Sequence, residues 1–500
     1  FKGGFFMRKD RIAKAFALFM TLVIAGTTGC GGRKTSLNET GNKNVSTQKT
    51  SDIQKKDGES SSSEVQDKKK ELVGKKKKSS VNLSNEEVKK CKQIYKDYNS
   101  SLLYHFLKQS WGDNPQKGLV ACSNINMYLA NGMLSEMTAG QSREQILNSF
   151  GKNMFRAAVS DCINVNDREE KEWEEEQKII RKMMGYISGK IKSENCSLGN
   201  SAWLSDKYDY SREAGTILKN DYNAYSLTGE MGSKSFNDKI NKWIDEQTGG
   251  KIKGNLKTNK DMAMLLLSAV NFKEQWKVRF DKNNTKKGIF YGQSAYTCGN
   301  TTEEEKIDKE KCSFLNSEYA YAYTENGRYQ AVSIPMTNAN MNIILPKENV
   351  AADKLINNKD AKQIISLCNT FNKKWDYSKI VKFSMPKLDF KSELELNPLM
   401  QDMGIKNIFN GKKADFSKMF VSDGENKSEG GIYVSKAKQN SRMTIDENGC
   451  SMASYTEIAL EALADEKKDT VTMNCNRPFI IIVSTSDGLP IFMGAVNRVV

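Results

Sequence analysis

The segment DENGCSMASYT at residues 446–456, followed by NRPF at residues 476–479, decides the fold of this 500-residue chain. From residue 450 to residue 461 the side chains alternate between two faces of an extended backbone, a period of two that is typical of a strand with one buried face. One face carries Cys450, Met452, Ser454, Thr456, Ile458 and Leu460, and the other carries Ser451, Ala453, Tyr455, Glu457, Ala459 and Glu461. A polar run at residues 465–469 separates this segment from the next predicted strand. The pattern therefore predicts an exposed loop that is able to become a strand.

Further motifs stand in a fixed order along residues 84–500. They are NSAWL at 200–204, NKWIDEQTGGKI at 241–252, FKEQW at 272–276 with Phe280, VKFSMPK at 381–387, ADFS at 414–417 and FMGAVN at 492–497. Each motif is weak alone, but their number and order resemble those of the serpins, a family of inhibitors that trap proteases by inserting a reactive loop into their own sheet. The resemblance implies the serpin fold, with three antiparallel-rich β-sheets, eight or nine helices and an exposed reactive loop.

The residues also predict a fold class directly. A capping box at Ser84 and Glu87 opens a predicted helix over 86–109, and further helices are expected at 124–136 and 142–150. Apolar runs predict strands at 262–270, 331–334, 342–345, 480–484 and 490–496. Helices that precede strands without regular alternation indicate an α+β domain built on antiparallel sheets.

The resemblance implies a mechanism without an enzyme active site of its own. A serine endopeptidase, or secondarily a cysteine endopeptidase, would cleave the loop and be held as an acyl-enzyme while the loop enters the main sheet. The implied hinge residues are Glu447, Gly449, Cys450, Ser451, Met452, Ala453 and Ser454, and Trp276 would lie where the sheet opens. Burial of three apolar loop residues (Met452, Ile458 and Leu460) on insertion would contribute on the order of 5–9 kcal/mol.

Several positions depart from the family's pattern. Cys450 and Met452 stand on the inserting face, where inhibitory members favour small residues. Residues 123–126 replace a serine-proline segment, Ser268 replaces an asparagine and Glu274 replaces a glycine. These departures predict a slower or leakier inhibitor than a strict-consensus member. They leave open a non-inhibitory serpin that acts as a binding module.

The position of the cleaved bond has two solutions. Counting sixteen residues beyond Glu447 places the bond between Leu463 and Ala464, which suits proteases with apolar or small primary pockets. Counting back from Phe479 points instead to Lys467 or Lys468, which would suit trypsin-like enzymes. We favour the Leu463–Ala464 bond.

The N-terminal region predicts export. Basic residues follow Met7, residues 15–26 form an apolar run too short to span a bilayer comfortably, and a Gly29–Cys30 junction ends it. This arrangement resembles a bacterial lipoprotein signal, so Cys30 is the expected lipid anchor; an ordinary secretory signal is the alternative. We expect residues 1–29 to be the export signal, 30–82 a disordered tether rich in Lys, Ser and Asn, and 83–500 the serpin domain. The protein would then be held on the outer face of the cytoplasmic membrane or the cell surface, or be released.

Charge and histidine content exclude several functions. The formal net charge of +15 lies mostly in residues 1–82, where 18 lysines and arginines face 8 acidic residues, so a basic tail explains it better than a nucleic-acid-binding surface. His105 is the only histidine and falls on the apolar part of a predicted helix, which argues against a nucleophile–histidine enzyme. Without phosphate-binding or metal-ligand motifs, we expect no cofactor and no metal, and a monomer.

An exported protein with ten cysteines is expected to form disulfide bonds. Cys298 and Cys312 flank an acidic insertion and are the predicted disulfide. Cys122 and Cys368 lie in apolar surroundings and are predicted to be buried free thiols. A solute-binding lipoprotein remains a rival interpretation of the tethered N-terminus, although the motifs near the C-terminal end oppose it.

Overall fold

The computed structural model describes residues 16–27, 83–112, 120–151, 168–191, 196–250, 252–292, 309–368, 375–421, 430–450 and 469–499. Within them, eight α-helices surround three larger sheets and one two-stranded sheet. Two of the three larger sheets have six strands each, and the third has four. The α+β class predicted from the sequence is confirmed.

The main sheet has the strand order β13-β14-β1-β5-β3-β4. Its strands are β13 (Leu388–Glu395), β14 (Gly430–Ile445), β1 (Phe16–Thr27), β5 (Met262–Phe272), β3 (Cys196–Ser205) and β4 (Ala224–Gly229). All neighbours are antiparallel except β3 and β4. The reactive-loop segment follows directly from β14, so this sheet positions the candidate site.

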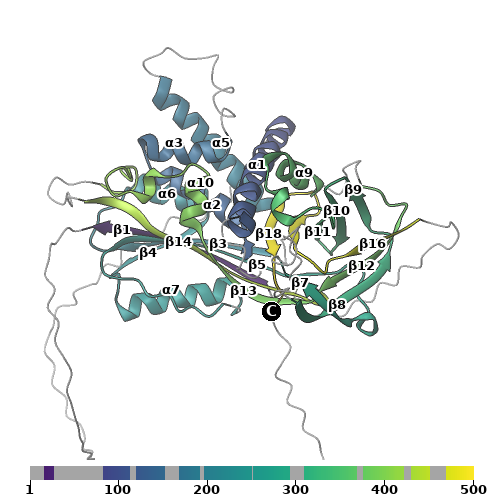
Figure 1. The fold of residues 1–500 in the computed structure, drawn as a ribbon. Coiled ribbons are helices and arrows are strands. Elements are labelled where there is room, and N and C mark those ends of the chain that lie inside the picture. Colours follow the sequence, from purple (N-terminus) through teal and green to yellow (C-terminus); the bar gives the residue numbers. More distant parts are fainter. Residues whose placement is uncertain are drawn as a thin grey trace, which may run out of the picture.

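Two further sheets lie beside the main sheet, to its right in Figure 1. The second has the order β2 (Val120–Cys122), β18 (Pro490–Val496), β17 (Phe479–Thr485), β11 (Ala339–Pro346), β10 (Tyr329–Pro335) and β9 (Ala322–Glu325). The third has the order β16 (Thr470–Asn474), β12 (Ile380–Pro386), β8 (Lys309–Tyr319) and β7 (Lys286–Tyr291). A two-stranded piece pairs β15 (Gly449–Cys450) with β6 (Glu274–Gln275).

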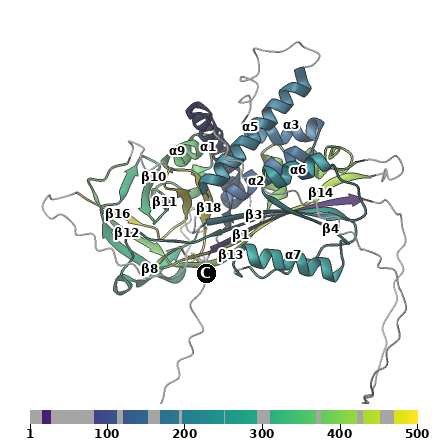
Figure 2. The ribbon, with the colours of Figure 1, turned by 180° about the vertical axis from the view of Figure 1, so that it is seen from behind.

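The helices cover the main sheet from both sides, as the two opposite views show (Figures 1 and 2). Helix α7 (Lys234–Gln247) lies on one face, and α1 (Asn85–Leu107), α2 (Asn124–Met137), α3 (Gly140–Ser149) and α6 (Arg212–Asn220) lie on the other. The remaining helices are α5 (Arg168–Ile191), α9 (Asn358–Leu367) and α10 (Leu396–Asp402), with short turns of helix at 108–112, 282–284, 352–355 and 407–409. Among the described residues, no helix has the length and apolar character that a bilayer crossing requires.

Local sequence signals place the predicted helices and strands within a few residues. The Ser84 hydroxyl accepts from the Glu87 N–H at 3.2 Å, and the Glu87 carboxylate accepts from the Ser84 N–H at 2.8 Å, which is the predicted capping box of α1. The strand expected at 490–496 is β18 without any shift. His105 lies on α1, on the predicted helix, and its side chain is half-buried.

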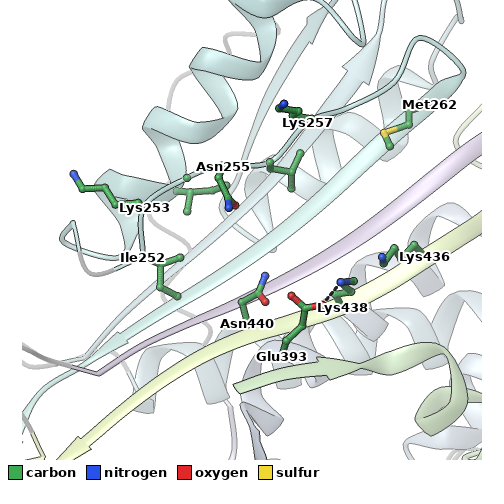
Figure 3. Close-up of a pocket in the computed structure, with 12 residues that line it drawn as sticks. Ile252, Lys253, Asn255, Lys257, Met262, Glu393, Lys436, Lys438 and Asn440 are labelled. Carbon is green, nitrogen blue, oxygen red and sulfur yellow. Dashed lines mark hydrogen bonds and ion pairs between the residues drawn. The ribbon is translucent and has the colours of Figure 1, made fainter. Parts of the chain in front are cut away.

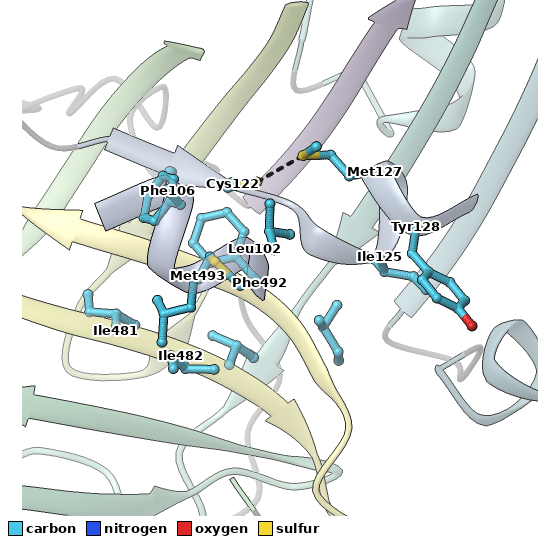
Figure 4. Packing of buried hydrophobic residues seen from close by; sticks show 14 of the residues in the cluster. Leu102, Phe106, Cys122, Ile125, Met127, Tyr128, Ile481, Ile482, Phe492 and Met493 are labelled. Atoms are coloured by element: carbon cyan, nitrogen blue, oxygen red, sulfur yellow. Dashed lines mark hydrogen bonds between the residues drawn. The ribbon is translucent and has the colours of Figure 1, made fainter. Parts of the chain in front are cut away.

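The principal core lies between α1, α2 and the second sheet. Figure 4 shows Phe106 of α1, Phe492 of β18 and Ile481 of β17 within this cluster, with the contact between Cys122 and Met127 at one side of it. Every residue of β17 and β18 is buried, because both faces of this sheet are covered. Continuous apolar runs are typical of strands in that position.

A second apolar cluster fixes α7 on the main sheet. Ile240 and Trp243 of α7 pack with Trp203 of β3 and with Leu265 and Leu267 of β5. Alternate side chains of β5 therefore pack on opposite faces of the sheet. Those of Met264, Leu266 and Val270 belong to the principal core. A strand buried on both faces in this way must be apolar throughout.

Residues 16–27, which we expect to belong to an export signal, form β1 in the centre of the main sheet, between β14 and β5. The export signal itself stays a prediction. A short apolar run is equally compatible with a signal segment and a buried strand, so sequence alone does not distinguish the two.

Candidate functional site

A tight turn at the end of β14 forms the hinge of the reactive-loop segment. The Asp446 N–H donates to the Gly449 carbonyl at 3.1 Å, and the Gly449 N–H donates to the Asp446 carbonyl at 3.3 Å. The Asn448 N–H donates to Oδ1 of Asp446 at 2.8 Å. The turn reverses the chain, so that residue 450 heads back beside the main sheet.

Gly449 makes this turn possible. Its φ of 148° lies in the region that favours glycine. A Cβ atom here would collide with the carbonyl oxygen of Glu274 and come within 2.7 Å of the Gln275 Cα. The close approach lets Gly449 and Cys450 pair with Gln275 and Glu274 as β15 and β6. Gly449 is therefore required for a close approach as well as for backbone freedom.

Trp276 fastens the hinge to the top of the main sheet. Its indole Nε1–H donates to the Asp446 carbonyl at 2.8 Å, and its backbone N–H donates to the Asn448 carbonyl at 3.2 Å. The ring is buried and packs edge-on against Phe280, 5.6 Å between centroids. Trp276 thus contacts the hinge turn directly, and its role in sheet opening stays a prediction.

Glu447 is held by a charged contact. Its carboxylate lies 2.8 Å (Oε2) and 3.0 Å (Oε1) from the Lys387 Nζ and accepts from the Thr285 hydroxyl at 2.8 Å. Burial opposes the charged form, but the hydrogen bonds from Lys387, the backbone and Thr285 outweigh it and hold the Glu447 pKa below its ordinary value. The Phe280 N–H also donates to the Glu447 carbonyl at 3.1 Å. These contacts hold Glu447, the first residue of the hinge, in place at the end of β14.

Glu274, which replaces a glycine of the family pattern, is buried beside the hinge. The Asn338 N–H and its side-chain Nδ2 each donate to the carboxylate at 3.2 Å. Asn338 lies in the turn between β10 and β11, so Glu274 links the hinge strand to the second sheet. Sequence analysis identified the substitution but not this partner.

A polar network lies beneath the centre of the main sheet, where the serine-proline segment of the family is replaced. Gln439 of β14 accepts from the Ser123 N–H at 2.6 Å and donates to the Ser123 carbonyl at 3.1 Å. On the β5 side, Asn126 donates to the Ser268 carbonyl at 3.3 Å and Ser268 donates to Asn200 at 2.6 Å. The start of α2 is thereby hydrogen-bonded to both strands that flank β1.

A pocket of about 280 Å³, lined by apolar as well as polar residues, opens on the α7 side of the same sheet (Figure 3). The connection from α7 to β5 contributes Lys253 and Asn255, and the outer face of β14 contributes Lys438 and Asn440. Lys438 forms an ion pair with Glu393 of β13. This face of β14 is half-exposed, whereas alternate residues of the strand are buried.

Most of the remaining predicted site residues lie outside the described part of the chain. Ser451, Met452, Ala453, Ser454, Leu463, Ala464, Lys467 and Lys468 of the loop, the anchor residue Cys30 and Cys298 lie outside the described residues. Cys312 is a half-buried free thiol in the structure, and its predicted disulfide with Cys298 stays a prediction. Cys122 and Cys368 are buried free thiols, as predicted.

His105, the one histidine of the sequence, lies half-buried on α1. Burial lowers the pKa of its imidazole. No group of three potential metal ligands occurs in the portion of the chain that the structure describes.

Comparisons with known proteins agree with this geometry. The family model described as "Serpin (serine protease inhibitor)" matches residues 97–499. An uncharacterized serpin-like protein of Methanosarcina acetivorans is 24% identical over 394 residues, 77% of this chain and 83% of its own length. Serpin B11 of Mus musculus is 23% identical and covers 74% of this chain and 91% of its own length. The crystal structure of the thermophilic serpin tengpin in its native state matches with a TM-score of 0.63 and 22% identity, covering 85% of this chain and 96% of tengpin. With a family model matched over most of its length and the hinge turn assembled beside the main sheet, this chain belongs to the serpin family, a family of non-enzymatic proteins.

Proposed function

We propose that this protein is a suicide inhibitor of serine endopeptidases, which traps the cleaving protease as an acyl-enzyme when its reactive loop inserts into the main sheet. The observation that carries the proposal is the register set by the hinge. Asp446 pairs with Gly449 across the turn. Any strand that continues from this pair runs antiparallel to β14, and its alternation is fixed.

The loop sequence matches that register. Continued from the Asp446–Gly449 pair, the apolar-rich loop face lies opposite buried positions of β14: Met452 with Met443, Ser454 with Ser441, Thr456 with Gln439 and Ile458 with Ala437. The other face carries Glu457, which comes opposite the half-exposed Lys438. A shift of one residue would place every side chain on the wrong face, so this agreement supports insertion.

Insertion would also provide a driving force. Burial of Met452, Ile458 and Leu460 contributes on the order of 5–9 kcal/mol, in addition to new ladder hydrogen bonds on both sides of the strand. Cleavage of the loop releases its constraint and makes that free energy available to displace the attached protease. Leu463–Ala464 is the proposed bond, and a protease with an apolar or small primary pocket is the proposed target.

We also propose that the protein is exported and acylated at Cys30. The charged start, the apolar run and the Gly29–Cys30 junction support this assignment. Conversion of Cys30 to serine should abolish detergent-phase partitioning of the expressed protein while leaving its folded domain intact. Unchanged partitioning would show that Cys30 is not the anchor.

The decisive experiment combines cleavage with a search for a complex. The processed protein is incubated with subtilisin-, elastase-, chymotrypsin- and trypsin-like enzymes, and the products are run on a denaturing gel and melted. We expect a covalent complex and a raised melting temperature with a protease that cleaves after Leu463. Ser454→Arg is the matched variant, because it places an unpaired charge on the buried face and should convert inhibitor into substrate. Clean cleavage without either change would reject inhibition.

A non-inhibitory serpin that binds a partner is the second candidate. The observation in its favour is the buried Cys450, paired with Glu274 directly after Gly449, where a larger thiol replaces the small residue of fast inhibitors. This candidate predicts loop cleavage without a gain in melting temperature, so the same experiment separates the two functions.

A further inference from the structure

The centre of the main sheet is occupied by an N-terminal strand. β1 pairs antiparallel with β14 from Ala17 with Arg442 to Thr27 with Gly430, and antiparallel with β5 from Phe16 with Phe272 to Ala25 with Met262. Figure 1 shows this strand in purple between β14 and β5. The segment is thus hydrogen-bonded along both edges, although it is about 400 residues distant from β14 in the sequence.

The position of β1 is the one that the reactive loop would require. On β14, Phe19 lies opposite Asn440, Thr21 opposite Lys438 and Val23 opposite Lys436. The register of the Asp446–Gly449 turn places loop residues 455, 457 and 459 opposite these same three residues. Residues 17–23 of β1 therefore occupy the places of loop residues 453–459, and in the same chain direction.

Only one strand at a time can form hydrogen bonds with the facing edges of β14 and β5. β1 already pairs with β14 from Ala17 to Thr27 and with β5 from Phe16 to Ala25, so loop residues from 453 onward have no ladder to join while β1 is in place. The composition of residues 16–27 suits this place, because nine of the twelve are apolar and a central strand covered on both faces must be apolar. The hinge bonds at Glu447 and Trp276 do not depend on β1, so the loop can remain outside the sheet.

We propose that residues 16–27 are an internal occupant of the loop-insertion site, which holds the unprocessed chain in a form that cannot insert its reactive loop. Cleavage between β1 and the serpin domain, such as the processing proposed before Cys30, removes the occupant and arms the protein. The consequence for inhibition rests on the proposed function, whereas the occupancy itself does not.

Loss of β1 also changes stability. Because β14 and β5 both run antiparallel to β1, they are parallel to each other and can close the space only as a parallel pair, which is slightly less stable per residue than antiparallel pairing. We expect the processed chain to melt at a lower temperature than the full chain and to regain the difference when a suitable strand is supplied.

The test uses a synthetic peptide of residues 449–463 and four proteins: the full chain, a chain that begins at residue 30, the full chain with Leu22→Pro and the full chain with Ile12→Pro. Proline in the middle of β1 removes ladder hydrogen bonds, whereas Ile12 lies outside the strand. We expect the shortened chain and Leu22→Pro to bind the peptide and rise in melting temperature. The full chain and Ile12→Pro should do neither. Peptide uptake by the full chain equal to that of the shortened chain would overturn the proposal.

A cross-link keeps the proposal testable if the altered chains do not fold. Thr21→Cys with Lys438→Cys in the full chain should form a disulfide on mild oxidation, because these residues are opposite in the register. Thr21→Cys with Lys391→Cys, on the strand beyond β14, should not. Absence of the 21–438 cross-link in peptide mapping would overturn the placement of β1.

The outcomes separate this proposal from the proposed function. A shortened chain that binds the peptide but never traps a protease would refute inhibition and leave the occupancy intact. A full chain that traps proteases as fast as the shortened chain would refute the occupancy and leave inhibition intact.

Discussion

The ammonium group of Lys387 lies 2.8 Å from the Glu447 carboxylate, joining the residue after β12 to the residue that begins the hinge. The two are 60 positions apart in the sequence. The Glu447 side chain is 9% exposed and that of Lys387 36% exposed, so the contact is sheltered on one side only. It fixes the point from which any movement of the reactive loop must start.

Replacement of Lys387 by methionine should lower the free energy of unfolding by about 1–2 kcal/mol, because a nearly buried carboxylate loses its charged donor while solvent screens part of the effect. Denaturant unfolding of the processed chain measures it. Lys382→Met is the matched control on β12, since its contact with Glu318 is 3.9 Å long and more than half exposed. Equal losses in the two variants would show that the Lys387–Glu447 contact has no special role.

Acid should weaken the hinge at the same carboxylate. The Glu447 pKa is lower in the folded chain than in the unfolded one. Its contribution is therefore fully present above the unfolded value, about 4.3, and is lost as the pH falls through the folded value. The stability difference between the wild type and Glu447→Gln should shrink as the pH falls from 6 towards 3.5. Glu318→Gln, a more exposed carboxylate, serves as the control, and a difference that grows on acidification would contradict the assignment.

Gly449→Ala should destabilise the hinge by about 1–3 kcal/mol, because the residue combines a left-handed φ with close contact to the backbone at Glu274 and Gln275. We expect faster proteolytic cleavage around residues 446–450 and a lower melting temperature. Gly327→Ala provides the comparison, since a Cβ atom there meets nothing within 4 Å. A fully stable Gly449→Ala protein would mean that the turn can relax without cost.

Gln439→Leu should cost about 1–3 kcal/mol, because it leaves the buried N–H and carbonyl of Ser123 without their side-chain partner. The loss should appear in thermal unfolding monitored by circular dichroism. Gln401→Leu, at an exposed position of α10, should change stability little. If Gln439→Leu were as stable as the wild type, α2 would not be fastened to β14 through this amide.

Sequence analysis located elements whose signals are local. The Ser84–Glu87 capping box predicted the start of α1, and apolar runs predicted β17 and β18, because cap chemistry and burial on two faces leave marks over a few residues. The hinge turn and Trp276 were found through motif order. Their identification did not require any knowledge of contacts.

The contacts that sequence analysis did not predict join residues that are far apart in the sequence. Nothing near Glu447 indicates Lys387, and nothing near Glu274 indicates Asn338 as its hydrogen-bond donor. The apolar run at 16–27 illustrates the same limit, because hydropathy describes the preference of a segment for burial and not the place where it is buried. Its position between β14 and β5 arises from pairing with strands far along the chain.

The arrangement of β17 and β18 in the second sheet has a consequence for the order of events during synthesis. These strands follow all other described elements in the sequence, yet they lie between β11 and β2. β2 lacks β18, its partner strand in this sheet, until the ribosome releases residues 479–496, so the chain cannot complete this sheet while they are still in the exit tunnel. Late closure through long-range contacts also predicts slow folding.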